Sequence, residues 1–335
     1  MARRSIRDPR LFGVEAAHAC RRLLDRDPKN VDWPASRSRR SVLVRFEDGA
    51  VIATRRSRSE RAQLEAHVMR VLHDGGAAVP RVLAFDGEWL IQEYLEGERL
   101  PHVLLNSDRG AARSALETAA HELARIHAIG RETGLVDQVV QLGRTDEWLA
   151  EFVNTPARIG EEIGVPASDL DVGALVEQLR ISSPALLKWD ARPGNAVFLG
   201  DGRVAWFDWE HCGVRNALDD FAWLLADEFV PVLDDLTEIA VANAPAEMTA
   251  DAARQYFTTY ATFHTAVRLA LVVRYREEDG EWWDEAMCLA QDKVRVTEAG
   301  TRALTARGEE FAACDPATRP LAGWFNAVAA RLGAA

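Results

Sequence analysis

Two different spacings of apolar residues divide the first part of the chain into helices and strands. Apolar side chains at three- and four-residue intervals predict helices, whereas short β-rich runs on either side of an Asp-Gly pair predict hairpins. The expected order is a helix at residues 10–27, a hairpin of residues 42–46 and 50–53, a helix at residues 59–73, and a hairpin of residues 81–85 and 89–94.

The pattern becomes mainly helical after Gly97. Helical spacing predicts helices at residues 111–129 and 172–181 and throughout the chain after Leu218, with a loop at Gly160 to Pro166. A third β-rich region runs from Leu186 to Trp209 around a tight turn at residues 200–202. We therefore expect an α+β protein with a small mixed lobe, residues 1–94, and a larger helical lobe, residues 95–335.

Composition sets broad limits on the class of protein. With 335 residues, 48% of them apolar, the chain is long enough for a large core. Its four cysteines, at positions 20, 212, 288 and 314, lack metal-ligand spacing and are expected to be reduced thiols. We find no apolar stretch of the length that a membrane span or a secretory signal needs, and we expect a cytoplasmic protein.

Charge is distributed unevenly along the chain. Residues 1–61 hold sixteen Lys and Arg against eight Asp and Glu, whereas the rest hold twenty-four against forty-four. A basic first segment suits a polyanion such as a triphosphate, and an acidic body favours cationic ligands. A solvated charged surface explains the same counts without any ligand.

The segment with the most chemical content is Lys188-Trp189-Asp190-Ala191-Arg192-Pro193-Gly194-Asn195, which lies between two predicted strands. A following strand ends at Asp208. Phosphoryl transfer needs one carboxylate to orient or deprotonate the acceptor hydroxyl, and Mg²⁺ takes another carboxylate together with a neutral oxygen donor. The spacing therefore indicates phosphoryl transfer, although an Asp and an Asn five residues apart also occur in ordinary turns.

This segment resembles the catalytic loop of the aminoglycoside-phosphotransferase and choline-kinase-like branch of the protein-kinase-like fold. The wording Asp-x-Arg-Pro-Gly-Asn, followed by Phe207-Asp208-Trp209-Glu210, is similar to that branch. The resemblance implies a bilobal kinase-like fold, with Asp190 as the catalytic base and with Asn195 and Asp208 as ligands of Mg²⁺. It also implies that Asp220 braces the catalytic loop.

The resemblance extends into the small lobe. Glu65 resembles the glutamate of the kinase helix C, although alone it is also a typical solvated helix acid. Residues 91–97 resemble the hinge, where backbone groups of Glu93 and Leu95 would hold the purine of ATP or GTP. We place His127, in a stretch similar to a large-lobe helix of the family, in the core.

Three departures from the family pattern concern phosphate binding. Lys188 stands where the family has a histidine, and it could reach a phosphate or form a salt bridge. The loop before the first strand has no glycine, so that Ser36 and Ser38 with neighbouring arginines would replace a glycine-rich grip. The strand after Gly49 contains no lysine, and among Thr54, Arg55 and Arg56 we favour Arg55 as the cation.

The acceptor is less constrained. A polar, cationic or neutral small molecule is expected near Asp190, and an acidic, tryptophan-containing run at residues 277–285 suits a cation or a sugar. The candidate contacts are Trp209, Glu210, His211, Asp219 and Trp282.

The resulting hypothesis is a small-molecule kinase that uses ATP or GTP with Mg²⁺, in a resistance or a metabolic role. We expect a monomer or homodimer that binds neither nucleic acid nor membranes. The alternative is a pseudokinase or nucleotide-sensing module with the same fold and no phosphotransfer.

Overall fold

The computed structural model describes residues 9–33, 40–56, 59–291 and 294–333. The chain divides into two compact units. The first runs to Glu96 and also contains Phe207–Glu210, and the second contains Gly97–Trp206 and His211–Ala335. The sequence places the boundary two residues earlier and does not anticipate that Phe207–Glu210 belong to the first unit.

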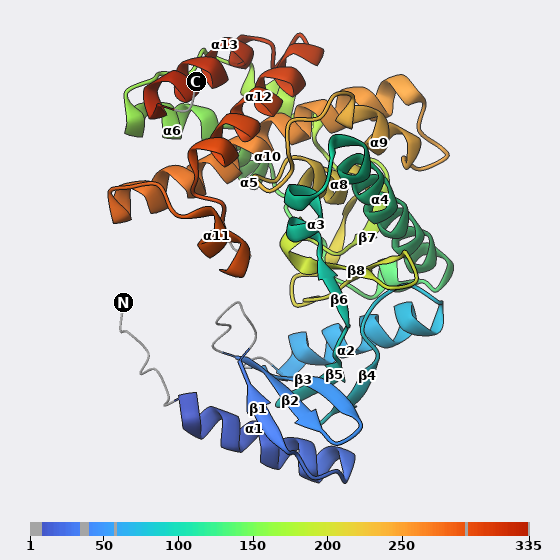
Figure 1. Cartoon of the computed structure of the whole chain (residues 1–335). Coiled ribbons are helices and arrows are strands. Elements are labelled where there is room, and N and C mark those ends of the chain that lie inside the picture. The colour runs from blue at the N-terminus through green and yellow to red at the C-terminus, as the bar shows by residue number, and fades with distance from the viewer. Residues whose placement is uncertain (1–8, 34–39, 57–58, 292–293, 334–335) are drawn as a thin grey trace. The chain divides into compact units, whose positions relative to one another are not determined.

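A five-stranded antiparallel sheet forms the centre of the first unit, with the strand order β1-β2-β3-β5-β4 (Figure 1). Both predicted hairpins are present, and Phe46 pairs with Gly49 around the first turn. The elements are α1 (Pro9–Leu24), β1 (Asn30–Asp32), β2 (Ser41–Phe46), β3 (Gly49–Arg55), α2 (Ser59–Asp74), β4 (Val82–Phe85) and β5 (Trp89–Glu93).

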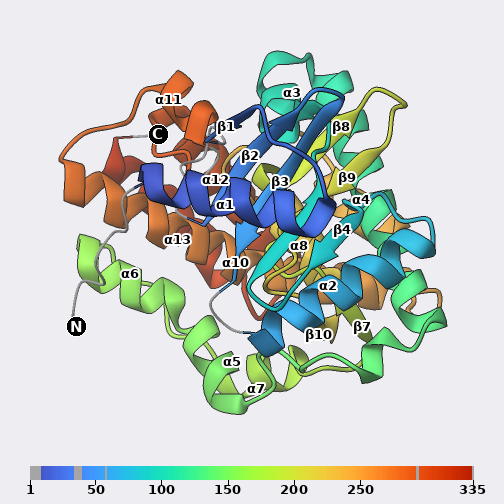
Figure 2. The same cartoon turned by 90° about the horizontal axis from the view of Figure 1, so that it is seen from below.

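Helix α1 crosses one face of this sheet, as Figure 2 shows. Its apolar stripe, which includes Phe12, Ala16 and Cys20, is buried in one core with strand residues such as Val44 and Ile91. Alternation along β2 and β3 supplies the other side of that core, because every second strand residue points to the same face. The apolar face of α1 therefore fixes which strand residues point toward it.

The second unit consists mainly of helices. Its elements are β6 (Gly97–Arg99), α3 (Leu100–Asn106), α4 (Arg109–Glu132), η1 (Leu135–Asp137), α5 (Asp146–Val153), α6 (Thr155–Ile163), α7 (Val172–Gln178), β7 (Pro184–Leu187), η2 (Pro193–Asn195), β8 (Ala196–Leu199), β9 (Val204–Trp206), β10 (Gly213–Asn216), α8 (Leu218–Leu225), α9 (Leu236–Ala242), α10 (Ala250–Asp279), α11 (Glu285–Gln291), α12 (Glu298–Cys314) and α13 (Pro320–Leu332).

Helix α10 is the central helix of this unit, and α8, α9 and α12 pack against it. The short strands form a three-stranded sheet, β6-β8-β9, and a two-stranded ribbon of β7 with β10. The predicted α+β class with a mainly helical second part is therefore confirmed. No helix among the described residues is both long enough and apolar enough to span a membrane.

The predicted loop at Gly160 to Pro166 is wrong in its first part, because α6 continues to Ile163. An added Cβ at Gly160 would lie 2.4 Å from the carbonyl oxygen of Val165. This glycine therefore permits a close backbone contact and does not end the helix. The helix ends instead at Gly164, which has a φ of 72°.

The contact between α4 and β7 provides a test of the packing beneath the loop that follows β7. An added Cβ at Gly130 in α4 would lie 2.6 Å from Cβ of Leu186, whereas Gly323 in α13 has open space there. Gly130→Ala should lower the free energy of unfolding by about 1–3 kcal/mol through overpacking. Gly323→Ala should raise it by up to about 1 kcal/mol through helix propensity. Urea denaturation measures both, and equal stability of the two variants would contradict the tight contact.

Candidate active site

The loop between β7 and β8 is held by a buried carboxylate. Asp220, in the first turn of α8, accepts hydrogen bonds from the backbone amides of Lys188, at 2.8 Å, and Trp189, at 3.0 Å. Its Oδ2 also lies 3.0 Å from Nε2 of His127, on α4. Because Asp220 is fully buried, these donors offset the cost of taking its charge out of water. Asp220 thus ties the start of the loop to two helices.

Trp189 and Asp190 both have left-handed backbone conformations, with φ values of 50° and 83°. Such conformations cost free energy for residues other than glycine and occur often at functional sites. Lys188, whose side chain is fully buried, donates from Nζ to the carbonyl oxygen of Asp190 at 3.0 Å. The strained turn is therefore held at its backbone, and Lys188 contributes to that restraint.

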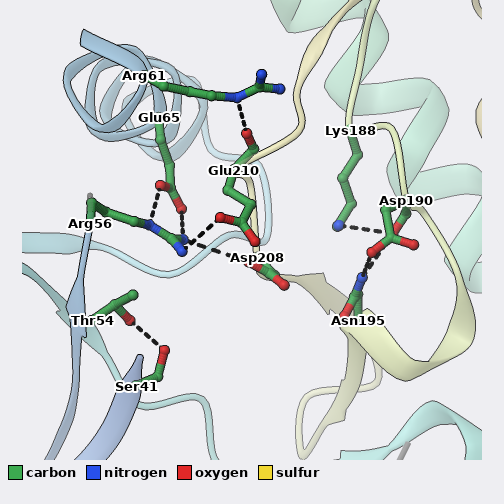
Figure 3. A network of polar contacts seen from close by, with 10 residues as sticks. All are labelled: Ser41, Thr54, Arg56, Arg61, Glu65, Lys188, Asp190, Asn195, Asp208 and Glu210. Carbon is green, nitrogen blue, oxygen red and sulfur yellow. Dashed lines mark hydrogen bonds and ion pairs between the residues drawn. The ribbon is translucent and has the colours of Figure 1, made fainter. Parts of the chain in front are cut away.

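The carboxylate of Asp190 is oriented by two side chains from its own loop. Asn195 donates from Nδ2 to Oδ2 of Asp190 at 2.7 Å and to the carbonyl oxygen at 2.9 Å (Figure 3). Nε of Arg192 lies 3.4 Å from Oδ1. Arg99 also donates to the carbonyl oxygen of Gly194. The loop therefore presents a half-buried carboxylate in one fixed orientation.

Arg56 joins three acidic side chains in the first unit, as Figure 3 shows. Its guanidinium forms a two-pronged contact with Glu65, with Nε at 2.7 Å and Nη2 at 2.5 Å from the carboxylate oxygens. Nη1 lies 3.1 Å from Glu210, and Nη2 lies 3.6 Å from Asp208. Arg61 donates to the carbonyl oxygen of Glu210 at 2.5 Å. This arrangement gathers Asp208 and a partly buried cation in one network.

The choice of Arg55 as the partner of Glu65 is wrong. Successive residues at the end of β3 point to opposite faces of the sheet. Arg55 reaches Glu15 on α1 at 2.8 Å and also pairs with Glu88, whereas Arg56 reaches Glu65 on α2. Acidic side chains lie on both faces of the sheet, so alternation along β3 could not show which of the two arginines pairs with Glu65. Thr54 is buried and contacts Ser41 through its hydroxyl at 2.9 Å.

Glu65 is 1% exposed and is not a solvated helix acid. Burial raises the pKa of Glu65 to about 7, while Arg56 acts in the opposite direction. Nearby Asp208 and Glu210 add to the increase. A glutamate placed in this way fixes the guanidinium of Arg56 through two parallel hydrogen bonds.

Several residues expected to contact an acceptor serve other purposes. Trp209 is wrong as an acceptor contact, because its side chain has an exposed fraction of 0%. Asp219 is also wrong, since it is fully buried between Arg215, at 2.5 Å, and the hydroxyl of Tyr256, at 2.7 Å. Glu210 belongs to the Arg56 network described above.

The other two acceptor candidates are more accessible. His211 is exposed. Trp282 is half-buried, and the guanidinium carbon of Arg276 lies 4.2 Å from the centre of its ring. Because the guanidinium of Arg276 already covers part of this ring, Trp282 offers less surface to a ligand than the sequence predicts.

The predicted nucleotide contacts are placed in part. Ser36 and Ser38 lie outside the described residues. The backbone amide of Glu93, the last residue of β5, donates to the carbonyl oxygen of Arg81 at 2.9 Å and is not available to a purine. Leu95 is half-buried just after this strand. The hinge role of both residues stays a prediction.

No role is assigned from the sequence to two arginines of these networks, Arg61 and Arg192. Arg192 lies inside the catalytic-loop motif, two residues after Asp190, so that its proximity to the carboxylate could have been anticipated. Arg61 gave no comparable signal, because its partner Glu210 is 149 residues away along the chain.

Comparison with solved structures shows a shared fold at low sequence identity. The spectinomycin phosphotransferase APH(9)-Ia, in a complex with AMP, aligns with a TM-score of 0.55 and 11% identity over 79% of this chain and 92% of that chain. A choline/ethanolamine kinase family protein from Mesorhizobium loti aligns with a TM-score of 0.54 and 15% identity over 89% and 92%. A GDP complex of an aminoglycoside 2'-phosphotransferase-IIIa variant aligns with a TM-score of 0.54 and 15% identity over 80% of this chain and 93% of that chain.

A search among curated protein sequences found no match. The sequence profile of the phosphotransferase enzyme family, APH, matches residues 34–257, which is more than half of the 335 residues. The solved structures agree with this match, because they have the protein-kinase-like fold that the catalytic-loop motif predicts. The chain therefore belongs to the phosphotransferase enzyme family, APH.

Proposed function

We propose that this protein transfers the γ-phosphate of ATP or GTP to a hydroxyl group of a small polar molecule. Asp190 is the base, Asn195 and Asp208 hold Mg²⁺, and Arg56 binds phosphate oxygens. The observation that carries the proposal is the restrained carboxylate of Asp190, which Asn195 and Arg192 hold on a left-handed turn. Nucleotides in the solved relatives, AMP in one and GDP in another, support the choice of donor.

The chemistry of the donor set fits Mg²⁺. This cation binds hard oxygen ligands, usually one or two carboxylates together with waters and phosphate oxygens. The side chain of Asp208 is 39% exposed and offers a carboxylate, and the amide nitrogen of Asn195 is engaged by Asp190, which leaves the amide oxygen for a cation. A nucleotide-bound Mg²⁺ does not need a cluster of protein ligands, and the described residues contain no group of three acidic, His or Cys ligands. Bound Mg²⁺ would neutralise charge on the phosphates.

The residues of the chain supply orientation and proton transfer. The carboxylate of Asp190 accepts a hydrogen bond from the acceptor hydroxyl and then takes its proton. Asn195 keeps that carboxylate from rotating, and the braces from Asp220 and Lys188 keep its backbone in place. Fixing the reacting groups in this way is the main contribution of a protein to phosphoryl transfer.

A second candidate is a nucleotide-binding module without transfer. It is favoured by the contacts of Arg56, whose guanidinium lies 3.6 Å from Asp208 and so compensates the charge of the proposed metal ligand. If this ion pair persists in the bound protein, nucleotide binding would not depend on Mg²⁺. The response to Mg²⁺ therefore separates the two candidates.

Asp190→Asn should remove the carboxylate that takes the proton of the acceptor hydroxyl and should leave nucleotide binding intact. We expect the rate of phosphate transfer to fall about 10²–10⁴-fold, which is the usual contribution of a general base. The dissociation constant of the nucleotide should stay unchanged in calorimetry. Asp201→Asn, in the exposed turn between β8 and β9, is the matched control. Normal turnover by Asp190→Asn would contradict the assignment.

Arg56→Gln should weaken binding of Mg·ATP or Mg·GTP about 10–100-fold, since charge-assisted hydrogen bonds to phosphate are lost. Arg55→Gln should change the affinity less than about twofold, because Arg55 contacts Glu15 and Glu88. Isothermal titration calorimetry measures both. Equal losses in the two variants would show that the Arg56 network has no special role in phosphate binding.

Removal of Mg²⁺ by a chelator should weaken nucleotide binding by the wild-type protein at least about tenfold, because the cation compensates phosphate charge. Asp208→Ala should bind the nucleotide weakly with or without Mg²⁺. Glu210→Gln, which changes the other acid beside Arg56, should keep the dependence on Mg²⁺. If the chelator leaves the nucleotide affinity of the wild-type protein unchanged, the result would support the nucleotide-binding module without phosphate transfer.

A further inference from the structure

Six rings of the second unit form a closed circuit next to Asp190. Going round the circuit, neighbouring ring centres are 4.3–6.4 Å apart. We call this set the aromatic circuit, and its members in order are Trp148, Trp189, Trp223, His264, Tyr260 and Phe152. The rings come from α5, α8, α10 and the loop after β7, and Trp189 directly precedes Asp190.

Three rings of the circuit are buried, and the other three are partly accessible. Phe152, Tyr260 and His264 are buried, whereas the three tryptophans retain part of their surface. Aromatic surface of this kind, combined with a few oriented polar groups, is typical of small-molecule sites. Because Trp189, which is half-buried, directly precedes Asp190, the circuit reaches the turn that carries the base.

Polar atoms without a hydrogen-bond partner occur at the same place. Nε1 of Trp223 and Nε2 of His264 are buried, and neither has a partner among the residues that the structure describes. Their rings are 4.3 Å apart, centre to centre. Buried polar groups in native proteins are almost always paired, so two unpaired atoms on adjacent rings indicate a hydrogen-bonding group from outside the chain, either a water or a ligand that displaces it.

A third such atom belongs to Asp227, which follows α8. Its Oδ2 accepts no hydrogen bond within the described part of the chain, and Arg268 lies 3.5 Å away. Arg268 lies one helical turn after His264 on α10. This links Asp227 to the circuit and adds a hydrogen-bond acceptor to the two ring nitrogens.

The charges around the circuit favour a neutral ligand. The guanidinium of Arg215 already lies over Trp148 and Tyr260, at 5.2 and 5.5 Å. Arg215 pairs with Asp219, and Arg268 pairs with Glu228. Burial, assisted by Arg268, lowers the pKa of His264 to about 3, so that its imidazole is neutral at pH 7. A cationic ligand would meet guanidinium groups whose counter-ions are already engaged. Burial and the neighbouring Glu228 also raise the pKa of Asp227, which reduces the negative charge of that carboxyl at pH 7.

We propose that the aromatic circuit binds the phosphate acceptor, and that this acceptor is a neutral ring compound bearing hydroxyl groups, such as a sugar or a nucleoside. The inference rests on the proposed function for its location beside the base. The ring of the ligand lies against the accessible parts of the three half-buried tryptophans. Its hydroxyl groups bond to Trp223, His264 and Asp227, and one further hydroxyl faces Asp190.

The test compares ligands that differ in charge. Binding to the full-length wild-type protein, without nucleotide, is followed by tryptophan fluorescence at pH 7. The neutral probes are methyl glucopyranoside, methyl galactopyranoside, myo-inositol and uridine, and the cationic probes are methyl glucosaminide and choline. We expect at least one neutral compound to bind about tenfold or more tightly than every cation. The uridine arm separates nucleosides from sugars. Preference for a cation, or no binding of any neutral compound, would overturn the proposal.

Two variants test the unpaired atoms themselves. Trp223→Phe and His264→Phe each remove a nitrogen and keep an aromatic ring, so binding of the preferred neutral compound should weaken about tenfold or more. His264→Phe should melt at the same temperature as the wild type or higher, because it removes a buried polar atom that lacks a partner. Unweakened binding of that compound by both variants would overturn the inference. Trp283→Phe is the control, since its Nε1 donates to Asp279 at 2.7 Å.

The same measurements separate this inference from the proposed function. If a neutral compound binds but Mg·ATP and Mg·GTP yield no phosphorylated product, the inference stands and the proposed transfer fails. If a cation is phosphorylated and the neutral compounds are not bound, the transfer stands and the inference fails.

Discussion

The carboxylate of Asp220 is the constraint on which the second unit's part of the site depends. It is fully buried, and it satisfies the amides of Lys188 and Trp189 as well as the imidazole of His127. Without this acceptor two loop amides and a histidine nitrogen would be buried without partners. The left-handed turn at Asp190 would then lose its anchor to α8 and α4 and depend on contacts such as those of Lys188 and Asn195. A single side chain on α8 thus connects the packing of the helices to the direction in which Asp190 points.

The fold and the local part of the site could be predicted from the sequence for the same physical reason. Periodicity and turn residues act over a few positions, and so does the spacing from Asp190 to Asn195, which are in contact. The loop predicted to begin at Gly160 is wrong because a glycine can also permit a close contact between backbone segments, which no local sequence pattern reveals. Whether Arg55 or Arg56 meets Glu65 depends on which helix covers each face of the sheet.

Long-range contacts account for the remaining errors. The rings of the aromatic circuit come from positions between 148 and 264, so no window of sequence contains them together. Trp209 follows Asp208 directly, but it is fully buried, and its position beside an accessible carboxylate gives no sign of that burial. The acidic balance of the chain after residue 61 is also a poor guide to ligands. Many of its acids are bound internally, as Asp219 is by Arg215 and Glu228 is by Arg268.

The acidic run at residues 277–285 illustrates the same effect. Asp279 accepts a hydrogen bond from Trp283, and Glu285 pairs with Arg295. Arg276 lies over the ring of Trp282. Acids and tryptophans that together suggest a cation site are therefore partly used to join the end of α10 to the segment after it.

Because Phe207–Glu210 belong to the first unit, one cut in the polypeptide cannot separate the two units completely. The polypeptide passes from one unit to the other after Glu96, after Trp206 and after Glu210. A fragment ending at residue 96 would keep Arg56 and Glu65 but lose Asp208 and Glu210, and so would carry an incomplete ion network. Exchange of the first unit between relatives by a single crossover would mix partners from two ancestors. Recombination within this family would therefore preserve the network only if both segments were inherited together.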